Sequence, residues 1–328
     1  MTITIADLGE HQVLQRLHRF CSPAVGDDAA IQSLPGNQQL VVTTDVLVDE
    51  VHFSDRTLPP IDLGWRAAAV NLSDLAAMGA TVVGLTVGLM LPAETPWPWL
   101  EGLYQGLSEC LNHYGGVIIG GDLCRSSARS VAITALGAVP KGQAFYRHHA
   151  QIGQVLVSTG MHGASRAGLA RLLQEFGLDS TDEPKREWVA AHRRPHPRFD
   201  AVTVLRGLQP TAQAIAVMDT SDGLADAVIQ ICAQSGLGAV LLRSQLPVPP
   251  GLVEAVGLAT ASQWCLYGGE DFELVLSLPK DVAMKFIAQL PGSQVIGYIT
   301  AEPGVRLVDD VTQEPEMILD QGKGYQHF

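Results

Sequence analysis

The chain alternates between apolar runs and amphipathic segments, a pattern that predicts an α/β (α+β) fold. In the first half, Val- and Ile-rich runs that end in Gly, Asp or Pro predict strands, and apolar residues at helical spacing predict the helices between them. The predicted strands are residues 39–43, 82–90, 116–119 and 131–139, and the predicted helices are residues 7–20, 63–79 and 97–113.

The second half continues this alternation after a turn-rich stretch near residues 140–152, where we expect a domain boundary. The predicted domains are therefore residues 1–145 and 146–328. A charged stretch at 180–187 that contains a proline is predicted to lie at the surface. The predicted strands are 154–160, 214–219, 238–242, 270–278 and 293–300, and the predicted helices are 164–176 and 221–236.

Composition narrows the class of protein. With 328 residues, of which 47% are hydrophobic and 17% charged, the chain is long and apolar enough to fold into two domains. A net charge of −13 argues against binding to duplex nucleic acid. We expect no signal peptide, because the N-terminus has no basic stretch followed by an apolar core. We also expect no membrane span, because the longest apolar stretch is short and interrupted by glycine. Five cysteines without CxxC spacing indicate reduced thiols and a cytoplasmic location.

Acidic motifs recur where the apolar runs end. Carboxylates at such places are poorly suited to packing, and they repel one another when they meet in one cleft. Lysine cannot offset this repulsion locally, since the first lysine is Lys141. Mg²⁺ prefers one or two carboxylates together with phosphate oxygens, so the pattern predicts a phosphate site bridged by several ions. The motifs are GDDAA (26–30), TTD (43–45), NLSDLAAMGA (71–80), GGDLCRS (120–126) and MDTSDGLADA (218–227).

Two of these motifs identify individual ligands by local geometry. Adjacent aspartates on an extended chain point apart, so we favour Asp28 as a ligand, with Asp27 either supporting the metal ligands indirectly or forming the turn. Thr43, Thr44 and Asp45 follow an apolar run and are predicted to lie where the strand becomes a loop, with three hard oxygen donors. An ordinary Asx or Ser/Thr turn is the alternative.

The Ser-Asp pairs at Asp74 and Asp222 are both predicted to open a helix. Ser and Asp are common N-caps, which is the structural alternative, but a helix N-terminus also offers free amides to a phosphate. Asp122 follows a double glycine that would let a phosphate approach the backbone, and Asp219 precedes the second Ser-Asp pair.

Absent motifs exclude other phosphate enzymes. The chain has no GxxxxGK[ST] and no protein-kinase motif set. GMHG (160–163) resembles half of a dinucleotide fingerprint, but packing is the role that we expect for it.

Taken together, the chain resembles the thiamine-monophosphate kinases, within the superfamily typified by aminoimidazole ribonucleotide synthetase. The resemblance spans nearly the whole chain and is carried by GDDAA, VNLSDLAAMGA, DxSDGL, YGGEDFEL (267–274) and the terminal GKGYQHF (322–328). Two residues depart from the family pattern. Thr43 stands where serine is common but keeps the hydroxyl, and Tyr267 stands where a small residue is usual and narrows the expected acceptor pocket.

The resemblance implies two α/β domains, with the N-terminal domain pairing in a homodimer. It also implies phosphorylation of thiamine monophosphate by ATP, in direct in-line transfer without a nucleophilic side chain. The implied Mg²⁺ ligands are Asp28, Thr43, Thr44, Asp45, Asp74, Asp122, Asp219 and Asp222. The implied ATP contacts are Tyr104, Gly121, Asp122, Arg147 and Ser221, and the implied substrate contacts are His52, Glu270 and Tyr325.

Three alternatives fit the sequence less well. A selenophosphate synthetase should have a reactive Cys and Lys upstream of the acidic motifs, and Cys21 has no lysine near it. A hydrogenase-maturation protein of the same superfamily should end in cysteine, whereas this sequence ends in GYQHF. A silent Mg-nucleotide sensor is disfavoured by the acceptor-side residues Glu270 and Tyr325.

Overall fold

The chain forms two compact units in the computed structural model, which describes residues 3–8, 10–22, 34, 36–175, 183–208, 215–310 and 315–324. The first unit is Met1–Leu75 with Ala80–Lys141, and the second is Ala76–Gly79 with Gly142–Phe328. Each unit combines a β-sheet with helices, which confirms the predicted α/β (α+β) architecture.

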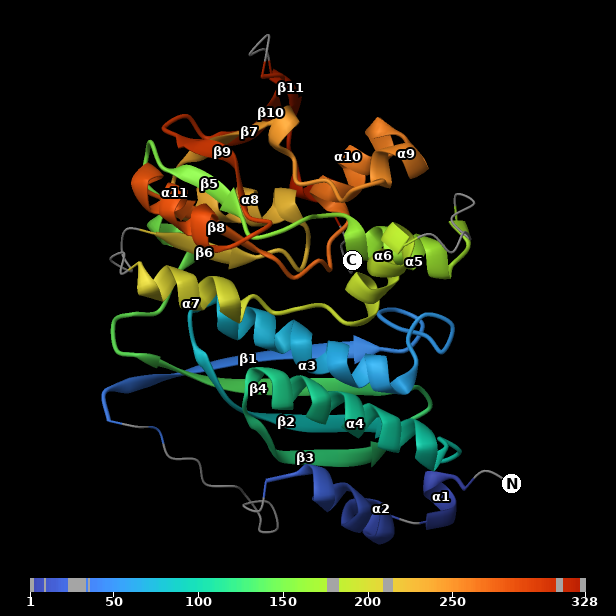
Figure 1. The fold of residues 1–328 in the computed structure, drawn as a ribbon. Helices are drawn as coiled ribbons and strands as arrows, with labels where there is room; N and C mark the ends of the chain where they lie inside the picture. The colour runs from blue at the N-terminus through green and yellow to red at the C-terminus, as the bar shows by residue number, and fades with distance from the viewer. Residues whose placement is uncertain are drawn as a thin grey trace. The chain divides into compact units, whose positions relative to one another are not determined.

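The first unit is built on a four-stranded sheet in the order β1-β4-β2-β3. Helices α3 and α4 cover one face of this sheet (Figure 1). Buried leucines of α3, α4 and β2 fill the space between them, among them Leu72, Leu85 and Leu103. The elements are α1 (Ile5–Leu8), α2 (Glu10–Leu17), β1 (Gln38–Val48), α3 (Pro60–Ala77), β2 (Thr81–Leu91), α4 (Trp97–Tyr114), β3 (Val117–Arg125) and β4 (Ser130–Pro140).

Helices α3 and α4 cross in close contact because glycine stands at the crossing point on each. A Cβ atom added to Gly64 of α3 would overlap the carbonyl oxygen of Leu103, and one added to Gly106 of α4 would overlap that of Ile61. In both cases the obstacle is backbone, which cannot rotate away as a side chain can. The two glycines therefore set how closely the helices approach.

The two faces of β1 differ sharply in their surroundings. Side chains alternate along a strand, and the Thr43 side chain points to α3, so Asp45 faces the same way. On the opposite face lie Leu40, Val42 and Val46, which are 50%, 57% and 48% exposed. The sheet thus has one face covered by helices and one apolar face that nothing in the described residues covers.

The second unit is built on a mixed seven-stranded sheet in the order β11-β10-β7-β9-β5-β8-β6, in which β10 and β7 are parallel and the other pairs antiparallel. Its strands are β5 (Val155–Ser158), β6 (Ala216–Asp219), β7 (Gly238–Leu242), β8 (Leu274–Leu278), β9 (Gln294–Thr300), β10 (Gly304–Val308) and β11 (Pro315–Ile318). Its helices are α5 (Ala164–Leu172), α6 (Glu183–Arg193), α7 (Phe199–Gly207), α8 (Leu224–Ser235), α9 (Leu252–Val256), α10 (Leu258–Tyr267) and α11 (Lys280–Gln289).

Two core clusters stabilise this sheet. Helix α8 packs Leu224, Val228 and Ile231 against buried residues of β7 and β9, and α11 contributes Phe286 to a second cluster with Leu276 of β8. This packing fixes the turn that leads from β6 into α8, and that turn contains the DTSDG motif.

Three local predictions were wrong. Thr43, Thr44 and Asp45 lie inside β1, because β1 pairs with β4 from Gln38 to Val48 without a break. Ser73 and Asp74 lie near the end of α3, so this Ser-Asp pair does not open a helix. Residues 270–273, predicted as part of a strand, precede β8. The charged stretch predicted to lie at the surface ends in helix α6, where Arg186 and Glu187 are exposed.

No helix among the described residues is both long and apolar enough to span a bilayer.

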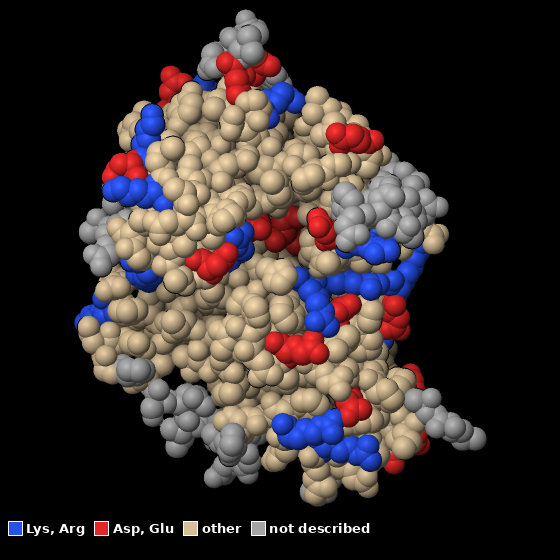
Figure 2. Space-filling view, in the orientation of Figure 1, with Lys and Arg blue, Asp and Glu red and all other residues tan. Residues whose placement is uncertain are grey.

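Figure 2 shows one face of the molecule, where acidic and basic side chains are interspersed on a surface that is mostly uncharged.

Candidate active site

The helix-covered face of β1 carries the first group of predicted ligands. Thr43 donates a hydrogen bond from Oγ1 to Oδ2 of Asp74, at 2.5 Å. Asp45 lies two residues along the same face, opposite the buried Ile133 of β4. Between Leu63 and Ala77, Asp74 is the one residue that is not buried. A carboxylate that emerges from an otherwise buried stretch of helix beside a hydroxyl and a second carboxylate provides hard oxygen donors of the kind that Mg²⁺ prefers.

Two other predicted ligands of this unit lie on the opposite face of the sheet. Thr44 donates from Oγ1 to the carbonyl oxygen of Ile133 at 2.9 Å and lies 3.1 Å from Oγ1 of Thr134. The register places Asp122 beside Gly88, Gly88 beside Ala132, and Ala132 beside Val46, so Asp122 is also on the apolar face. Within this unit, the structure groups Thr43, Asp45 and Asp74 and separates them from Thr44 and Asp122.

The other predicted site residues of the first unit have contacts that give each of them a role in packing or in a turn. The Tyr104 side chain is buried, its ring centroid lies 5.6 Å from that of Phe20, and burial raises the pKa of its hydroxyl. Gly121 is required by packing, since a Cβ there would overlap the backbone of Val87. His52 accepts a hydrogen bond at Nδ1 from the Val48 amide, 3.0 Å away, and so holds the turn after β1.

The turn between β6 and α8 brings together the second group of predicted residues. Asp219 ends β6 with its side chain buried, and Ser221 donates from Oγ to Oδ1 of Asp219 at 3.2 Å. Asp222 precedes Gly223, whose φ of 109° opens helix α8. The prediction that this Ser-Asp pair begins a helix is confirmed, and the free amides of the helix N-terminus favour an anionic ligand.

A second turn, residues 267–273, lies against the first. The amide of Glu270 donates to the carbonyl oxygen of Ser221 at 2.7 Å. Glu270 has a φ of 61°, and its carboxylate lies 3.9 Å from Nδ1 of His192. The predicted acceptor contact Glu270 and the predicted nucleotide contact Ser221 are therefore neighbours, although they are far apart in the sequence.

Two carboxylates of the YGGEDFEL motif that were not among the predicted site residues support these turns. Glu273 forms an ion pair with Arg198 and accepts a hydrogen bond from Thr159 Oγ1, and burial raises the pKa of its carboxyl. Asp271 accepts from the amides of Gly163 and Ser165, at 2.7 and 2.9 Å, and so caps helix α5. Burial raises the pKa of Asp271 to about 7 against these two donors, which lower it.

Two further segments reach helix α8. Arg147 donates from Nη1 to Oε1 of Gln230 at 2.7 Å. Near the C-terminus, Gln321 donates from Nε2 to Oδ1 of Asp226 at 2.8 Å, which places the start of the GKG segment beside the first turn of α8. Asp27, Asp28 and Tyr325 lie outside the described residues.

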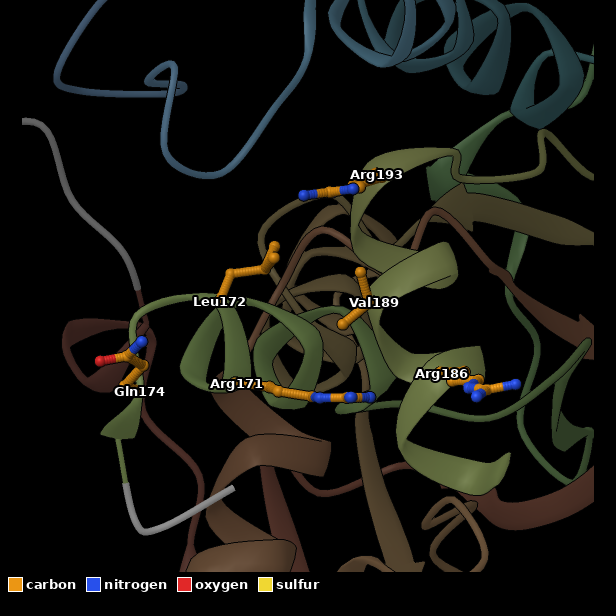
Figure 3. Close-up of a pocket in the computed structure, with 6 residues that line it drawn as sticks. All are labelled: Arg171, Leu172, Gln174, Arg186, Val189 and Arg193. Carbon is orange, nitrogen blue, oxygen red and sulfur yellow. The ribbon is translucent and has the colours of Figure 1, made fainter. Parts of the chain in front are cut away.

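A separate pocket of about 410 Å³ lies between α5 and α6, and no predicted site residue lines it. Figure 3 shows its lining, to which α6 contributes Arg186, Val189 and Arg193. In the described part of the chain, no three His, Cys, Asp or Glu side chains are grouped closely enough to hold a metal by themselves. A metal bound at the group of Thr43, Asp45 and Asp74 would therefore need hydroxyl, phosphate or water oxygens as additional ligands.

Two family models match the chain, one in each half. Residues 26–139 match the N-terminal domain of the AIR synthase related proteins, and residues 151–310 match the C-terminal domain of the same family. The thiamine-monophosphate kinase of Synechococcus elongatus is 49% identical over 292 residues, which cover 88% of this chain and 87% of the relative.

Two solved structures have a similar fold. The thiamine-monophosphate kinase of Stenotrophomonas maltophilia K279a superposes with a TM-score of 0.79 at 31% identity, covering 90% of this chain and 95% of that one. AaThiL, whose structure is a complex with AMPPCP and TMP, gives a TM-score of 0.77 at 27% identity and full coverage of both chains. The chain therefore belongs to the thiamine-monophosphate kinase family, whose two domains are those of the AIR synthase related proteins.

Proposed function

We propose that this protein phosphorylates thiamine monophosphate to thiamine diphosphate with ATP as the phosphate donor. The similarity to the Synechococcus elongatus kinase over most of both chains carries the proposal. The AaThiL complex with AMPPCP and TMP supports the choice of the two substrates. The contact between the Glu270 and Ser221 turns supports it further, because it places a predicted acceptor contact beside a predicted nucleotide contact.

The acceptor is itself a phosphate, so its oxygen is already ionised and no side chain needs to act as nucleophile. The main barrier is the repulsion between two polyanions. Oxygens of Thr43, Asp45 and Asp74 fit Mg²⁺ and would hold it, with Asp219 and Asp222 as the proposed ligands of the second unit. When bound, such an ion screens phosphate charge and aligns the groups for in-line transfer.

The remaining residues are proposed contacts. Ser221 and Arg147 would bind ATP, the latter with a planar guanidinium suited to phosphate oxygens, and Glu270 and His52 would bind the acceptor. We also propose residues 1–145 and 146–328 as the functional domains and the cytoplasm as the location. The five free cysteines are in keeping with a reducing compartment.

The first test is an assay of the purified protein with ATP, Mg²⁺ and thiamine monophosphate. We expect thiamine diphosphate and ADP in equal amounts, with activity lost on chelation and restored by Mg²⁺. Labelled ATP without acceptor should leave the protein unlabelled, because transfer is direct. Activity that persists in excess chelator would contradict the metal role, and a labelled peptide from residues 215–227 would contradict direct transfer.

We further propose that the apolar face of the first unit's sheet pairs with a second copy of the chain. Leu40, Val42 and Val46 form an exposed apolar row along β1, and burial of such a row is favourable. Thr44 and Asp122 lie on this face, so pairing would bring them near the second copy.

Substitution Val42→Asp should then dissociate the dimer, because it places a charge in the centre of the apolar row. Light scattering at micromolar concentration should give a dimer mass for the unsubstituted protein and a monomer mass for the variant. Val253→Asp is the matched control, since Val253 is an exposed valine of α9 in the second unit. A monomer mass for the unsubstituted protein would refute the proposal.

A further inference from the structure

The two turns that carry Ser221 and Glu270 form one hydrogen-bonded piece of backbone. Besides the Glu270–Ser221 bond, the Thr220 amide donates to the carbonyl oxygen of Glu273 at 2.9 Å, and the Glu273 amide donates to Thr220 Oγ1 at 3.2 Å. The turns are also in close contact at Gly269, where a Cβ would lie 2.9 Å from the carbonyl oxygen of Ser221. The position of Glu270 therefore depends on how the 267–273 turn is held.

This turn has an unusual backbone conformation. Glu270 and Phe272 have φ values of 61° and 52°, in the left-handed region that residues with a Cβ rarely adopt. A residue with a Cβ is less stable in this conformation than in an ordinary one, so surrounding interactions must hold it there. Phe272 contributes by burying its ring, with only 4% of its surface exposed.

Carboxylates on both sides of Phe272 fasten the turn to the connection between β5 and α5. On one side, Asp271 is bound by the amides of Gly163 and Ser165. On the other side, Glu273 is held by Thr159 and by Arg198, with 17% of the Glu273 side chain and 12% of the Arg198 side chain exposed. A buried ion pair of this kind is weak support for stability, which suggests another reason for its presence.

Arg198 and Thr159 are themselves fixed in place. Arg198 donates from Nη1 to the carbonyl oxygen of Thr159 at 2.8 Å, and its Nε and Nη2 bind the two oxygens of Asp200, each at 2.9 Å. Thr159 Oγ1 also accepts from the Leu274 amide at 2.8 Å. These hydrogen bonds fix the orientation of the guanidinium, in which Nη1 also donates to Glu273.

We infer that Glu273, Arg198 and Thr159 are positioning residues, which hold Glu270 in its left-handed conformation at the acceptor side of the site. The expected kinetic effect rests on the proposed function. The anchoring of the turn rests only on the contacts described above. None of the three needs to touch a substrate. Their effect should appear in acceptor binding, because the anchor acts directly on the turn of residues 270–273, whereas the 219–223 turn is also held by helix α8.

The test compares Glu273→Gln and Thr159→Val with Thr159→Ser, which keeps the hydroxyl, and with Phe286→Leu, which weakens the core of the same unit elsewhere. We expect Glu273→Gln and Thr159→Val to raise the KM for thiamine monophosphate by about 10- to 100-fold, since small misplacements of a positioning group have effects of this size. The Kd for Mg-ATP should change by less than about threefold in all four variants. Thr159→Ser and Phe286→Leu should keep the KM of the unsubstituted protein.

Hydrogen exchange provides a readout that needs no substrate. The Glu270 amide should lose its protection in Glu273→Gln and Thr159→Val and keep it in Phe286→Leu. If the unsubstituted protein fails to phosphorylate thiamine monophosphate, the proposed function is wrong, and the exchange measurement still decides whether the anchor exists. Unchanged exchange at residues 269–272 in Glu273→Gln, or an equal rise of KM in Phe286→Leu, would overturn the inference.

Discussion

Asp74→Asn is expected to lower the turnover number by about 100-fold or more, the size of loss seen when a group that stabilises transition-state charge is removed. Asparagine has nearly the same volume and can still accept the hydrogen bond from Thr43. The substitution therefore removes the charge and leaves the packing of α3 intact. The loss should be larger in turnover than in KM for ATP, since the charge matters most while the phosphoryl group is in transfer.

Steady-state kinetics at saturating Mg²⁺ measures this effect, and thermal unfolding verifies that the variant is folded. Glu94→Gln is the control, because it removes one carboxylate charge from an exposed position of the same unit. It should leave turnover unchanged. Near-normal turnover in Asp74→Asn would refute a metal site on the helix-covered face of β1.

Gly106→Ala is expected to destabilise the first unit by about 3 kcal/mol, at the upper end of the cost of overpacking a core. The added methyl group would overlap the carbonyl oxygen of Ile61 in α3, and neither backbone can yield without moving the helices apart. Gly64→Ala should have a similar effect, because it overlaps the backbone of α4 at the same crossing. The double variant should cost less than the sum, since one displacement of the helices relieves both overlaps.

Denaturant unfolding followed by circular dichroism gives the free energies. Gly36→Ala is the matched control in the same unit, because no atom lies within 4 Å of the added Cβ and Gly36 does not have a positive φ. Its stability should be unchanged or slightly raised, as the unfolded chain loses freedom. Equal stability of Gly106→Ala and Gly36→Ala would show that the helices separate at little cost.

The sequence predicted the order of strands and helices in the first unit well, because each element there has a clear apolar period. It failed at Thr43–Asp45, where the end of an apolar run was taken as the end of a strand. Threonine is a good strand former, and pairing with β4 extends β1 through the polar residues to Val48. The hydrophobic pattern of β1 alone therefore could not indicate where the strand ends, because its end depends on the length of β4.

The two Ser-Asp pairs show a related limit. The pair at Asp222 begins a helix and the pair at Asp74 lies near the end of one, although the local sequences are alike. Helix α3 is buried on nearly all sides between Leu63 and Ala77, and the apolar pattern that predicted a helix over residues 63–79 continues through Ser73 and Asp74. Burial of this kind depends on tertiary packing, which outweighs the capping preference.

The anchor of the Glu270 turn could not be predicted at all from spacing. Thr159, Arg198 and Glu273 are separated by tens of residues, and each stands in a different loop. A carboxylate or guanidinium in a loop is most often solvated, and only the fold brings these three together. The motifs that contain Ser221 and Glu270 were visible because several unusual residues are contiguous there, and Glu273 lies in the second of them, but neither motif indicated Thr159 and Arg198 as its partners.

The alternation of side chains in β1 limits which sequence changes this strand can accept during evolution. A single-residue deletion in β1 that shifted residues 43–48 by one position would exchange the two faces of that part of the strand. Asp45 would then turn away from Asp74, and Val46 would turn toward the helices. Insertions and deletions should therefore be rare in this strand, whereas point substitutions that keep the alternation can accumulate on one face independently of the other.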